Sequence, residues 1–514
     1  IPFPEPLSCH QVATNGEVST VDGCSGSINS ANLRLRLEPT FHVSEDISVH
    51  AQFDVLDNLV LGSTPEGTYL AGSGSPVDEP LDFASNGQDP VQADRNYVYD
   101  AIRVKRAWGE VRTPVGLLKF GRMPSHWGLG VFTHGGGQDD FHGSYCYDCD
   151  HGDTVDRLVF GTTVPGTKLQ AAIGLDWASN QPAAAQTSLW AQRADGQPWD
   201  LDDADDVHQW LFVLADFDKP ERWDEKIAEG KTAFDWGVHV LYRTQDHEST
   251  DSDPNATTQT EASDYTLATN PDRIKIVRRG ATAYIPDVYV RLGRGIFDLE
   301  IEAAAVYGTI ENLDDINPTG NAALTNEIDL LKLGAVARAS FRFFDDKLKL
   351  GLEAGYASGD EWEPAKQGQT NFHAIPFLPL APIDNDATRF LFNPNYHVDL
   401  ILFRELIGTV TNAFYIRPSL DYDLSERFVF RAQGVASLAP VPVSTPGNSR
   451  WYGIELDGDI GYYNQEEKFF AGASYGFLIP MGALDHPGEL GYDEAEAGEA
   501  STAHTFQLRL MIGF

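Results

Sequence analysis

The feature that most constrains this chain is a period-two alternation of apolar and polar side chains, which recurs in segments of roughly 9–13 residues. In residues 33–38, leucines alternate with Arg34, Arg36 and Glu38, and residues 47–55 continue the pattern after a turn. Successive side chains of a β-strand point to opposite faces, so each segment predicts a strand with one apolar face.

The connections between these segments alternate in length along the chain. Tight turns are predicted near residues 44–46, 113–114, 165–166, 293–295, 345–346, 424–425 and 464–467, with a longer turn at 219–231. Long polar connections occupy residues 57–96, 123–152, 177–206, 245–279, 310–327, 359–396, 439–450 and 481–501. Transmembrane barrels sort their connections in this way, with short periplasmic turns and long extracellular loops. No apolar run reaches the ~18 residues that a membrane-spanning helix needs.

We therefore predict an all-β protein, a transmembrane antiparallel up-and-down β-barrel of about 18 strands. Residues 1–30 are expected to form an N-terminal extracellular segment, and residues 31–514 a single barrel domain. About 17 strands are clear, and single-chain bacterial barrels have an even number, so a further strand is expected upstream of Ile1. Alternatively, the apolar run at 398–407 is itself a strand.

The C-terminal segment places apolar side chains on one face up to the last residue, namely Phe506, Leu508, Leu510, Ile512 and Phe514. An apolar alternation that ends on a C-terminal aromatic residue resembles the assembly signal of Gram-negative outer-membrane barrels. It implies the outer membrane as the location, with membrane lipid, lipopolysaccharide and the barrel-assembly machinery as partners. Association into a homo-oligomer is a further expectation for such a protein.

If the apolar face of each strand contacts lipid, the opposite face lines the lumen. The predicted lumen-lining residues are Arg34, Arg36, Arg103, Lys105, Lys119, Arg291, Lys332, Arg338, Arg417, Arg431, Arg509, Glu300, Glu302, Glu353, Glu455 and Asp457. Such a wall orients polar solutes in a water-filled pore, or its charges pair across strands and stabilise the wall. The lumen is expected to be aqueous unless loops fold inward. The stretch Ile375 to Pro382 is a candidate constriction loop or a surface patch for a partner.

The overall charge excludes one class of partner. The chain carries 37 Lys and Arg against 76 Asp and Glu, a formal net charge of −39, and nucleic-acid binding needs a basic footprint. Histidines 126, 134, 142 and 151 share a region with several acids, but no nucleophile or metalloprotease motif accompanies them. We therefore expect no enzymatic activity.

The four cysteines form two close pairs, which predict disulfides Cys9–Cys24 and Cys146–Cys149 in an oxidising compartment. The second pair lies in an acidic connection. Its Asp148, Asp150, Asp153 and Asp156 are spaced for a hard cation such as calcium, the one cofactor suggested by the sequence. The alternative is a solvated acidic loop held by the Cys146–Cys149 bridge.

Aromatic residues near the predicted strand ends, among them Trp127, Tyr289, Tyr307 and Trp451, suggest interfacial girdles. A sugar-binding track is the alternative for these side chains.

Residues 120–130, which contain Gly121 and Arg122, follow a predicted strand and open a long connection. They resemble the strand–Gly-Arg–loop element of porin-like and alginate-export-type barrels. Together with residues 33–39 and 105–111, they are also similar to uncharacterised outer-membrane proteins of myxobacteria and relatives. The resemblance implies a basic lumen that acts as a passive pore or as a polysaccharide conduit. Arg122 is the residue of this chain to which the role of the family's motif is transferred. His126 and Trp127 depart from the alginate-export pattern.

These observations predict a porin, an outer-membrane channel for passive diffusion of small hydrophilic solutes. One alternative is an exporter of an anionic polysaccharide, guided by the arginines of the wall. Another is a structural or adhesive surface protein that the barrel anchors.

Overall fold

The computed structural model describes residues 29–60, 102–136, 152–178, 207–251, 274–312, 327–361, 386–486 and 498–513, together with short strands within 10–20 and 64–89. The chain divides into two compact units, residues 2–112 and residues 113–514. No helix among the described residues is long and apolar enough to cross a membrane.

The first unit is a small antiparallel sheet with short additional hairpins. Its strands are β1 (His10–Val12), β2 (Val18–Thr20), β3 (Asn32–Leu37), β4 (Thr40–His42), β5 (Ile47–Val60), β6 (Thr64–Pro65), β7 (Thr68–Tyr69), β8 (Pro76–Val77), β9 (Gln88–Asp89) and β10 (Ile102–Thr113). Strand β5 pairs with β10 on one side and with β3 and β4 on the other. The short strands pair as β1–β2, β6–β9 and β7–β8.

The second unit contains most of the strands. They are β11 (Gly116–Pro124), β12 (Thr154–Thr163), β13 (Leu169–Ala178), β14 (Val207–Asp216), β15 (Ala233–Asp251), β16 (Ile274–Arg294), β17 (Phe297–Ile310), β18 (Ile328–Phe343), β19 (Leu348–Ala357), β20 (Asp386–Ala387), β21 (Ala413–Asp423), β22 (Phe428–Leu438), β23 (Trp451–Asn464), β24 (Phe469–Pro480) and β25 (Ala503–Ile512). Its helices are α2 (Pro220–Ala228), the π-helix η5 (Leu402–Ile407), and the 3-10 helices η6 (Pro442–Ser444) and η7 (Gly482–Leu484).

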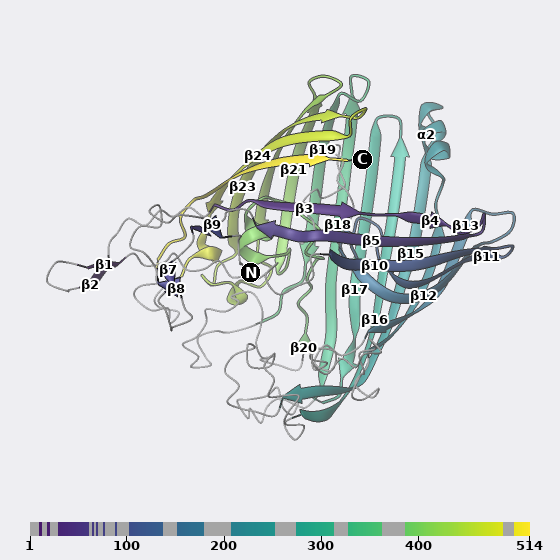
Figure 1. Ribbon diagram of the computed structural model, residues 1–514, viewed down its shortest axis with the longest axis horizontal. Helices are drawn as coiled ribbons and strands as arrows, with labels where there is room; N and C mark the ends of the chain where they lie inside the picture. Colours follow the sequence, from purple (N-terminus) through teal and green to yellow (C-terminus); the bar gives the residue numbers. More distant parts are fainter. Residues whose placement is uncertain are drawn as a thin grey trace. The chain divides into compact units, whose positions relative to one another are not determined.

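Within the second unit, the strands follow one another in the sheet in chain order, each antiparallel to the next (Figure 1). The exception is the two-residue β20, which pairs parallel to β18 while β19 pairs directly with β21. The predicted fold class, an all-β antiparallel up-and-down barrel, is confirmed. If β3 and β4 count as one interrupted strand, and β20 and the short hairpins are left aside, the described residues form 17 strands, three in the first unit and fourteen in the second. The sequence predicts the same number of strands.

The tight turns also lie where the sequence predicts them, but two expectations about the connections are wrong. Residues 398–407 do not form a strand, because they include the buried π-helix η5. The expected loop at 245–279 is shorter, since β15 extends to Asp251 and β16 begins at Ile274.

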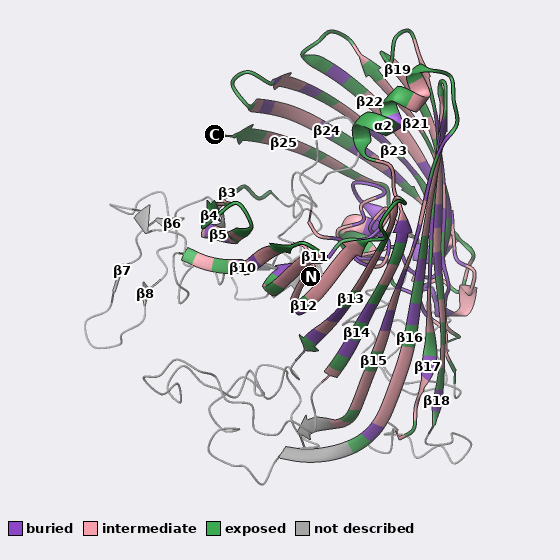
Figure 2. Cartoon of the chain, turned by 90° about the vertical axis from the view of Figure 1, so that its right-hand side faces the viewer, coloured by how far each residue is buried: buried purple, intermediate pink, exposed green. Residues whose placement is uncertain are grey.

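The two faces of the second unit's sheet differ, as alternating exposure along the strands shows (Figure 2). On what we call the outer face, strand pairing brings one apolar residue from each of eight neighbouring strands into a row: Phe120, Leu158, Leu175, Trp210, Tyr242, Tyr284, Tyr307 and Leu331. Two residues nearer the long connections, a second row on the same face is mainly polar: Arg122, Asp156, Trp177, His208, Thr244, Thr282 and Thr309. The change from aromatic to polar side chains marks one border of an apolar band.

The height of this band fits a membrane. On β17, outer-face residues run from Phe297, which packs against Phe341 at the tight-turn end, to Tyr307 in the aromatic row. Ten residues at ~3.3 Å each span ~33 Å along the strand. A tilt of ~40° reduces this to ~25 Å, the height of the apolar band of outer-membrane barrels.

Candidate functional site

Two segments that lie between long strands pack on the inner face of the sheet, the face opposite to the apolar rows. The first, residues 125–136, follows β11. Gly128 and Gly130 have φ of +56° and +86°, which suits glycine, and a hydrogen bond from Gly130 N–H to the Trp127 carbonyl closes a tight turn (2.9 Å). At Gly128 a Cβ atom would lie 2.4 Å from a carboxylate oxygen of Glu302. The segment can therefore approach the wall only with a glycine there.

Glu302 of β17 holds this first segment. Its carboxylate accepts hydrogen bonds from three consecutive backbone N–H groups, those of Leu129, Gly130 (3.0 Å) and Val131 (2.9 Å). Glu302 has no exposed surface. Burying a carboxylate is costly unless donors surround it, and here the backbone of the segment supplies them.

The second segment, residues 386–412, is held in the same way by Glu455 of β23. The Glu455 carboxylate accepts from the backbone N–H groups of Leu400 (2.9 Å), Ile401 (2.7 Å) and Leu402 (2.9 Å). The Asp399 carboxylate then accepts from Phe403 N–H (3.0 Å) at the start of η5. The two anchoring glutamates, Glu302 and Glu455, thus bind different segments by one arrangement.

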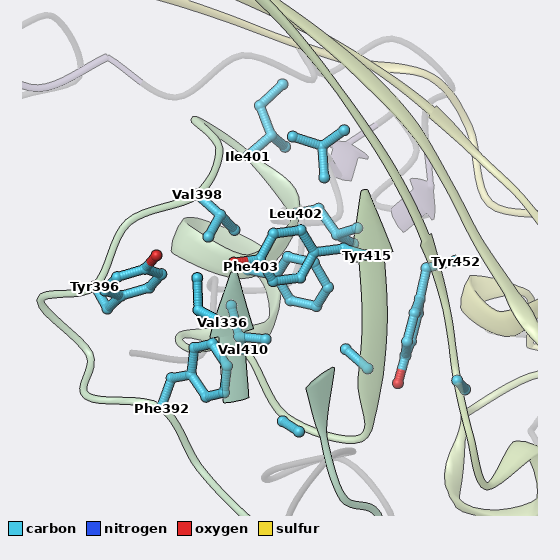
Figure 3. Packing of buried hydrophobic residues seen from close by; sticks show 14 of the residues in the cluster. Val336, Phe392, Tyr396, Val398, Ile401, Leu402, Phe403, Val410, Tyr415 and Tyr452 are labelled. Carbon is cyan, nitrogen blue, oxygen red and sulfur yellow. The ribbon is translucent and has the colours of Figure 1, made fainter. Parts of the chain in front are cut away.

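An apolar cluster also fixes the second segment. Phe403 lies 6.2 Å from Tyr415 and 6.1 Å from Tyr452, measured between ring centroids (Figure 3). Phe390 and Phe392 are also buried and pack edge to face. Phe403 belongs to the apolar stretch at 398–403, which lacks the alternation of a strand.

The two segments contact each other. The Asn393 backbone N–H donates to the Val131 carbonyl (2.7 Å), and its side-chain amide donates to the Asp153 carboxylate (2.6 Å). The same carboxylate accepts from His134 N–H (2.9 Å). Asp153 therefore joins both segments to the start of β12.

The wall around the second segment contains an ion-paired cluster. Glu353 of β19 accepts from Arg338 (2.9 Å), from Arg417 and from the Tyr415 hydroxyl (2.6 Å). The two arginines also reach the segment, since Arg338 donates to the Tyr396 hydroxyl (3.3 Å) and Arg417 to the Val398 carbonyl (3.2 Å). These cations therefore position residues 396–398.

Further residues that the sequence analysis placed in the lumen pair across strands. Such contacts include Arg36–Asp54 (2.7 Å), Arg291–Asp298 (3.3 Å), Arg431–Asp421 (2.6 Å), Glu300–Tyr289 (2.7 Å), Asp457–Gln433 (3.0 Å) and Arg509–Ser474 (3.1 Å). Arg34, Arg103, Lys105, Lys119 and Lys332 are half-buried. All sixteen predicted residues are buried or half-buried, whereas apolar side chains dominate the exposed positions of their strands. Their role as the lining of an open pore remains a prediction.

Several other predicted residues have different or undescribed positions. Arg122 lies on the outer face and forms a bidentate pair with Asp156 (2.8 and 2.7 Å). Trp127 and Tyr289 are not girdle residues, because Trp127 is buried in the first segment and Tyr289 donates to Glu300 on the inner face. Tyr307 and Trp451 are exposed on their strands.

The calcium and disulfide hypotheses remain predictions. Asp148, Asp150 and the four cysteines lie outside the described residues, as do Ile375 to Pro382 and Phe514. Within the described ranges, no cluster of three or more His, Cys, Asp or Glu side chains is arranged to hold a metal. Asp153 and Asp156 bind Asn393 and Arg122 instead.

Burial changes the ionisation of one group in each segment. In the first, burial lowers the pKa of His134 to about 4, and the nearby His126 adds to the effect. The His126 and His134 rings pack edge to face at 5.2 Å. In the second, burial and the neighbouring Glu455 raise the pKa of Asp399 to about 8. The contributions of His134 and Asp399 to the stability of their segments are thus expected to change with pH in opposite directions.

The anchoring role of Glu302 and Glu455 could not be found in the local pattern. Each alternates with apolar neighbours like any other inner-face residue, and Leu129 is 173 positions away from Glu302 in the sequence. The sequence signals for this arrangement lie in the segments themselves. They are the glycines at 128 and 130, and the apolar stretch at 398–403, which breaks the period of two.

Comparison with known proteins finds similar folds at low similarity. No protein-family model and no curated protein matches the sequence. Among solved structures, Pseudomonas aeruginosa OccK5 (OpdH) is 11% identical with a TM-score of 0.40, over 87% of this chain and 86% of that one. OccK11 (OpdR) of the same organism is 11% identical with a TM-score of 0.39, over 94% and 96%. The outer-membrane protein OmpT of Vibrio cholerae is 9% identical with a TM-score of 0.33, over 84% and 81%.

Proposed function

We propose that this protein is an outer-membrane channel through which small hydrophilic solutes diffuse, and that residues 125–136 and 386–412 narrow its passage. The apolar band on the outer face supports the membrane location, with lipid and lipopolysaccharide as its surroundings. Charged side chains on the inner face support a polar lumen. The observation that carries the proposal is the pair of inward segments, each anchored by three backbone hydrogen bonds to a wall glutamate.

The exporter alternative has less support. A guide for an anionic polymer needs cations that are available to the polymer, whereas Arg338 and Arg417 both bind Glu353 and Arg431 binds Asp421. The other alternative is a barrel that only anchors a surface protein. A transport measurement distinguishes it from the channel.

Liposome swelling with neutral sugars of increasing size tests the proposal. A channel narrowed by packed segments admits monosaccharides and gives progressively slower swelling with larger sugars. Liposomes that contain the protein but swell no faster than protein-free vesicles would support the anchor instead.

A further inference from the structure

The helix α2 lies in the connection between β14 and β15, at the end of the sheet where the tight turns are (Figure 1). Its Trp223 side chain is buried and packs over β16, where a Cβ atom added at Gly293 would lie 2.7 Å from the Trp223 ring. The guanidinium carbon of Arg291 lies 4.1 Å from the centroid of the same ring. Arg291 and Gly293 alternate with outer-face residues of β16, so α2 covers the inner face of the sheet at its periplasmic end.

Ion pairs and a backbone hydrogen bond fix the start of α2. The Asp218 N–H donates to the Asp235 carboxylate (2.8 Å), and Asp235 is paired with Arg291 in the strand register. The Asp218 carboxylate binds Lys226 of α2 and lies 3.6 Å from Lys168, which precedes β13. The helix is therefore held on the wall by polar as well as aromatic contacts.

Phe217 connects α2 to the first inward segment, since it lies between β14 and α2 in the chain. Its ring centroid is 6.0 Å from that of Trp127 and 6.0 Å from that of Tyr289. Gly293, on which α2 packs, is four residues from Tyr289 along β16, a distance of ~13 Å at ~3.3 Å per residue. Phe217 bridges this interval between the helix and Trp127.

Trp127 fixes the first segment because its backbone closes the turn that Glu302 binds. The Trp127 carbonyl accepts from Gly130 N–H (2.9 Å), and the Trp127 N–H donates to the Thr133 carbonyl (3.1 Å). The indole ring is closely packed, since a Cβ atom added at Gly237 would lie 2.6 Å from it. A shift of this ring therefore moves the backbone N–H groups that face Glu302.

We propose that α2 positions the first segment from the periplasmic end, with Phe217 and Trp223 as positioning residues, and so sets the width of the passage. The proposal rests on the channel described under the proposed function. While Trp223 is packed on β16, Phe217 stays against Trp127 and the segment stays on Glu302. When α2 leaves the wall, the segment loses this support and leaves Glu302 more often.

Hydrogen exchange of the full chain in detergent tests the proposal. Trp223→Ala should release α2 and accelerate exchange in residues 125–136 about fivefold, the ratio that loss of an aromatic contact worth ~1 kcal/mol gives. Residues 398–403 of the second segment should keep their rate, which a general loss of stability would not allow. Trp223→Phe should restore slow exchange, because an aromatic ring again covers Gly293. Phe217→Ala should accelerate exchange in residues 125–136 while α2 stays protected.

Trp210→Ala is the matched control, because Trp210 is exposed on the outer face of β14. It should leave exchange in residues 125–136 unchanged. The single-channel conductance of Trp223→Ala should rise, and adding this substitution to Glu302→Ala should give no further rise.

Three results would overturn the proposal: an unchanged exchange rate of residues 125–136 in Trp223→Ala, equal acceleration of both segments, or additive effects of Trp223→Ala and Glu302→Ala on conductance. Hydrogen exchange reports on the contact between α2 and the segment whether or not the protein conducts. Failure of this proposal and failure of the channel can therefore be told apart.

Discussion

The two inward segments share one kind of anchor and both bind Asp153, but they differ in how they turn and in how many apolar side chains they bury. Residues 125–136 turn on two glycines and bury few apolar side chains, chiefly Trp127 and Val131. Residues 386–412 contribute nine buried residues to a large aromatic and aliphatic cluster and include a π-helix in which the Phe403 N–H donates to Asp399. The comparison teaches that the same glutamate arrangement is the main support of the first segment and one support among several of the second.

The largest effect is expected from Glu302→Ala. Removing the carboxylate leaves the N–H groups of Leu129 and Val131 without their acceptor, while Gly130 N–H keeps its bond to the Trp127 carbonyl, and each unsatisfied buried donor costs about 1–3 kcal/mol. We expect the first segment to leave the wall, with a single-channel conductance at least ~1.5-fold higher and a lower melting temperature.

Glu300→Ala is the control for this variant. Glu300 lies on the same face of the same strand but binds the Tyr289 hydroxyl, not a segment. An equal rise in conductance for both variants would contradict the anchoring role of Glu302.

Glu455→Ala should lower stability by a comparable amount but change conductance less. The Phe403 ring stays packed between Tyr415 and Tyr452, so the second segment retains its place after its anchor is removed. Hydrogen exchange of residues 398–403 should rise only modestly. If this variant opened the channel as far as Glu302→Ala, the proposed difference between the segments would be wrong.

The third prediction concerns the hydrogen bond from Asn393 of the second segment to Asp153, which also binds the first segment. A double-mutant cycle on Asn393→Ala and Asp153→Ala should give a coupling energy of about 1 kcal/mol in the free energy of unfolding, as expected for one hydrogen bond to a half-buried carboxylate. Additive effects of the two substitutions would show that this side-chain hydrogen bond does not couple the segments.

The smallest effects are expected from pH. His134 has a pKa of about 4 when buried and ~6.5 when released, so its contribution to the docked first segment is complete above pH ~6.5 and is lost as the pH falls towards 4. Asp399 has a pKa of about 8 when buried and ~3.9 when released, so the second segment loses stability as the pH rises towards 8.

Hydrogen exchange, corrected for the intrinsic rate, should therefore accelerate in residues 125–136 at pH 5 and in residues 398–404 at pH 8.5. His134→Gln should remove the acid response alone. Acceleration of both segments at the same end of the pH range would contradict the assignment.

The sequence predicted the strands and turns because these depend on local alternation and turn chemistry. Leu350 and Leu352, for instance, alternate with Glu353 and its neighbours in a way that fixes the two faces of β19. The inward segments depend instead on hydrogen bonds between residues far apart in the chain. For that reason the local pattern predicts Glu302 and Glu455 as lumen-lining residues and Asp153 as a calcium ligand, but not their hydrogen bonds to the segments.

The most direct test of the account is a planar-bilayer comparison of the unmodified protein with the double variant Glu302→Ala/Glu455→Ala. The account predicts stepwise currents from both proteins, with larger and noisier steps from the double variant because both segments have lost their anchors. Absence of stepwise current from the unmodified protein, or identical steps from the two proteins, would contradict it.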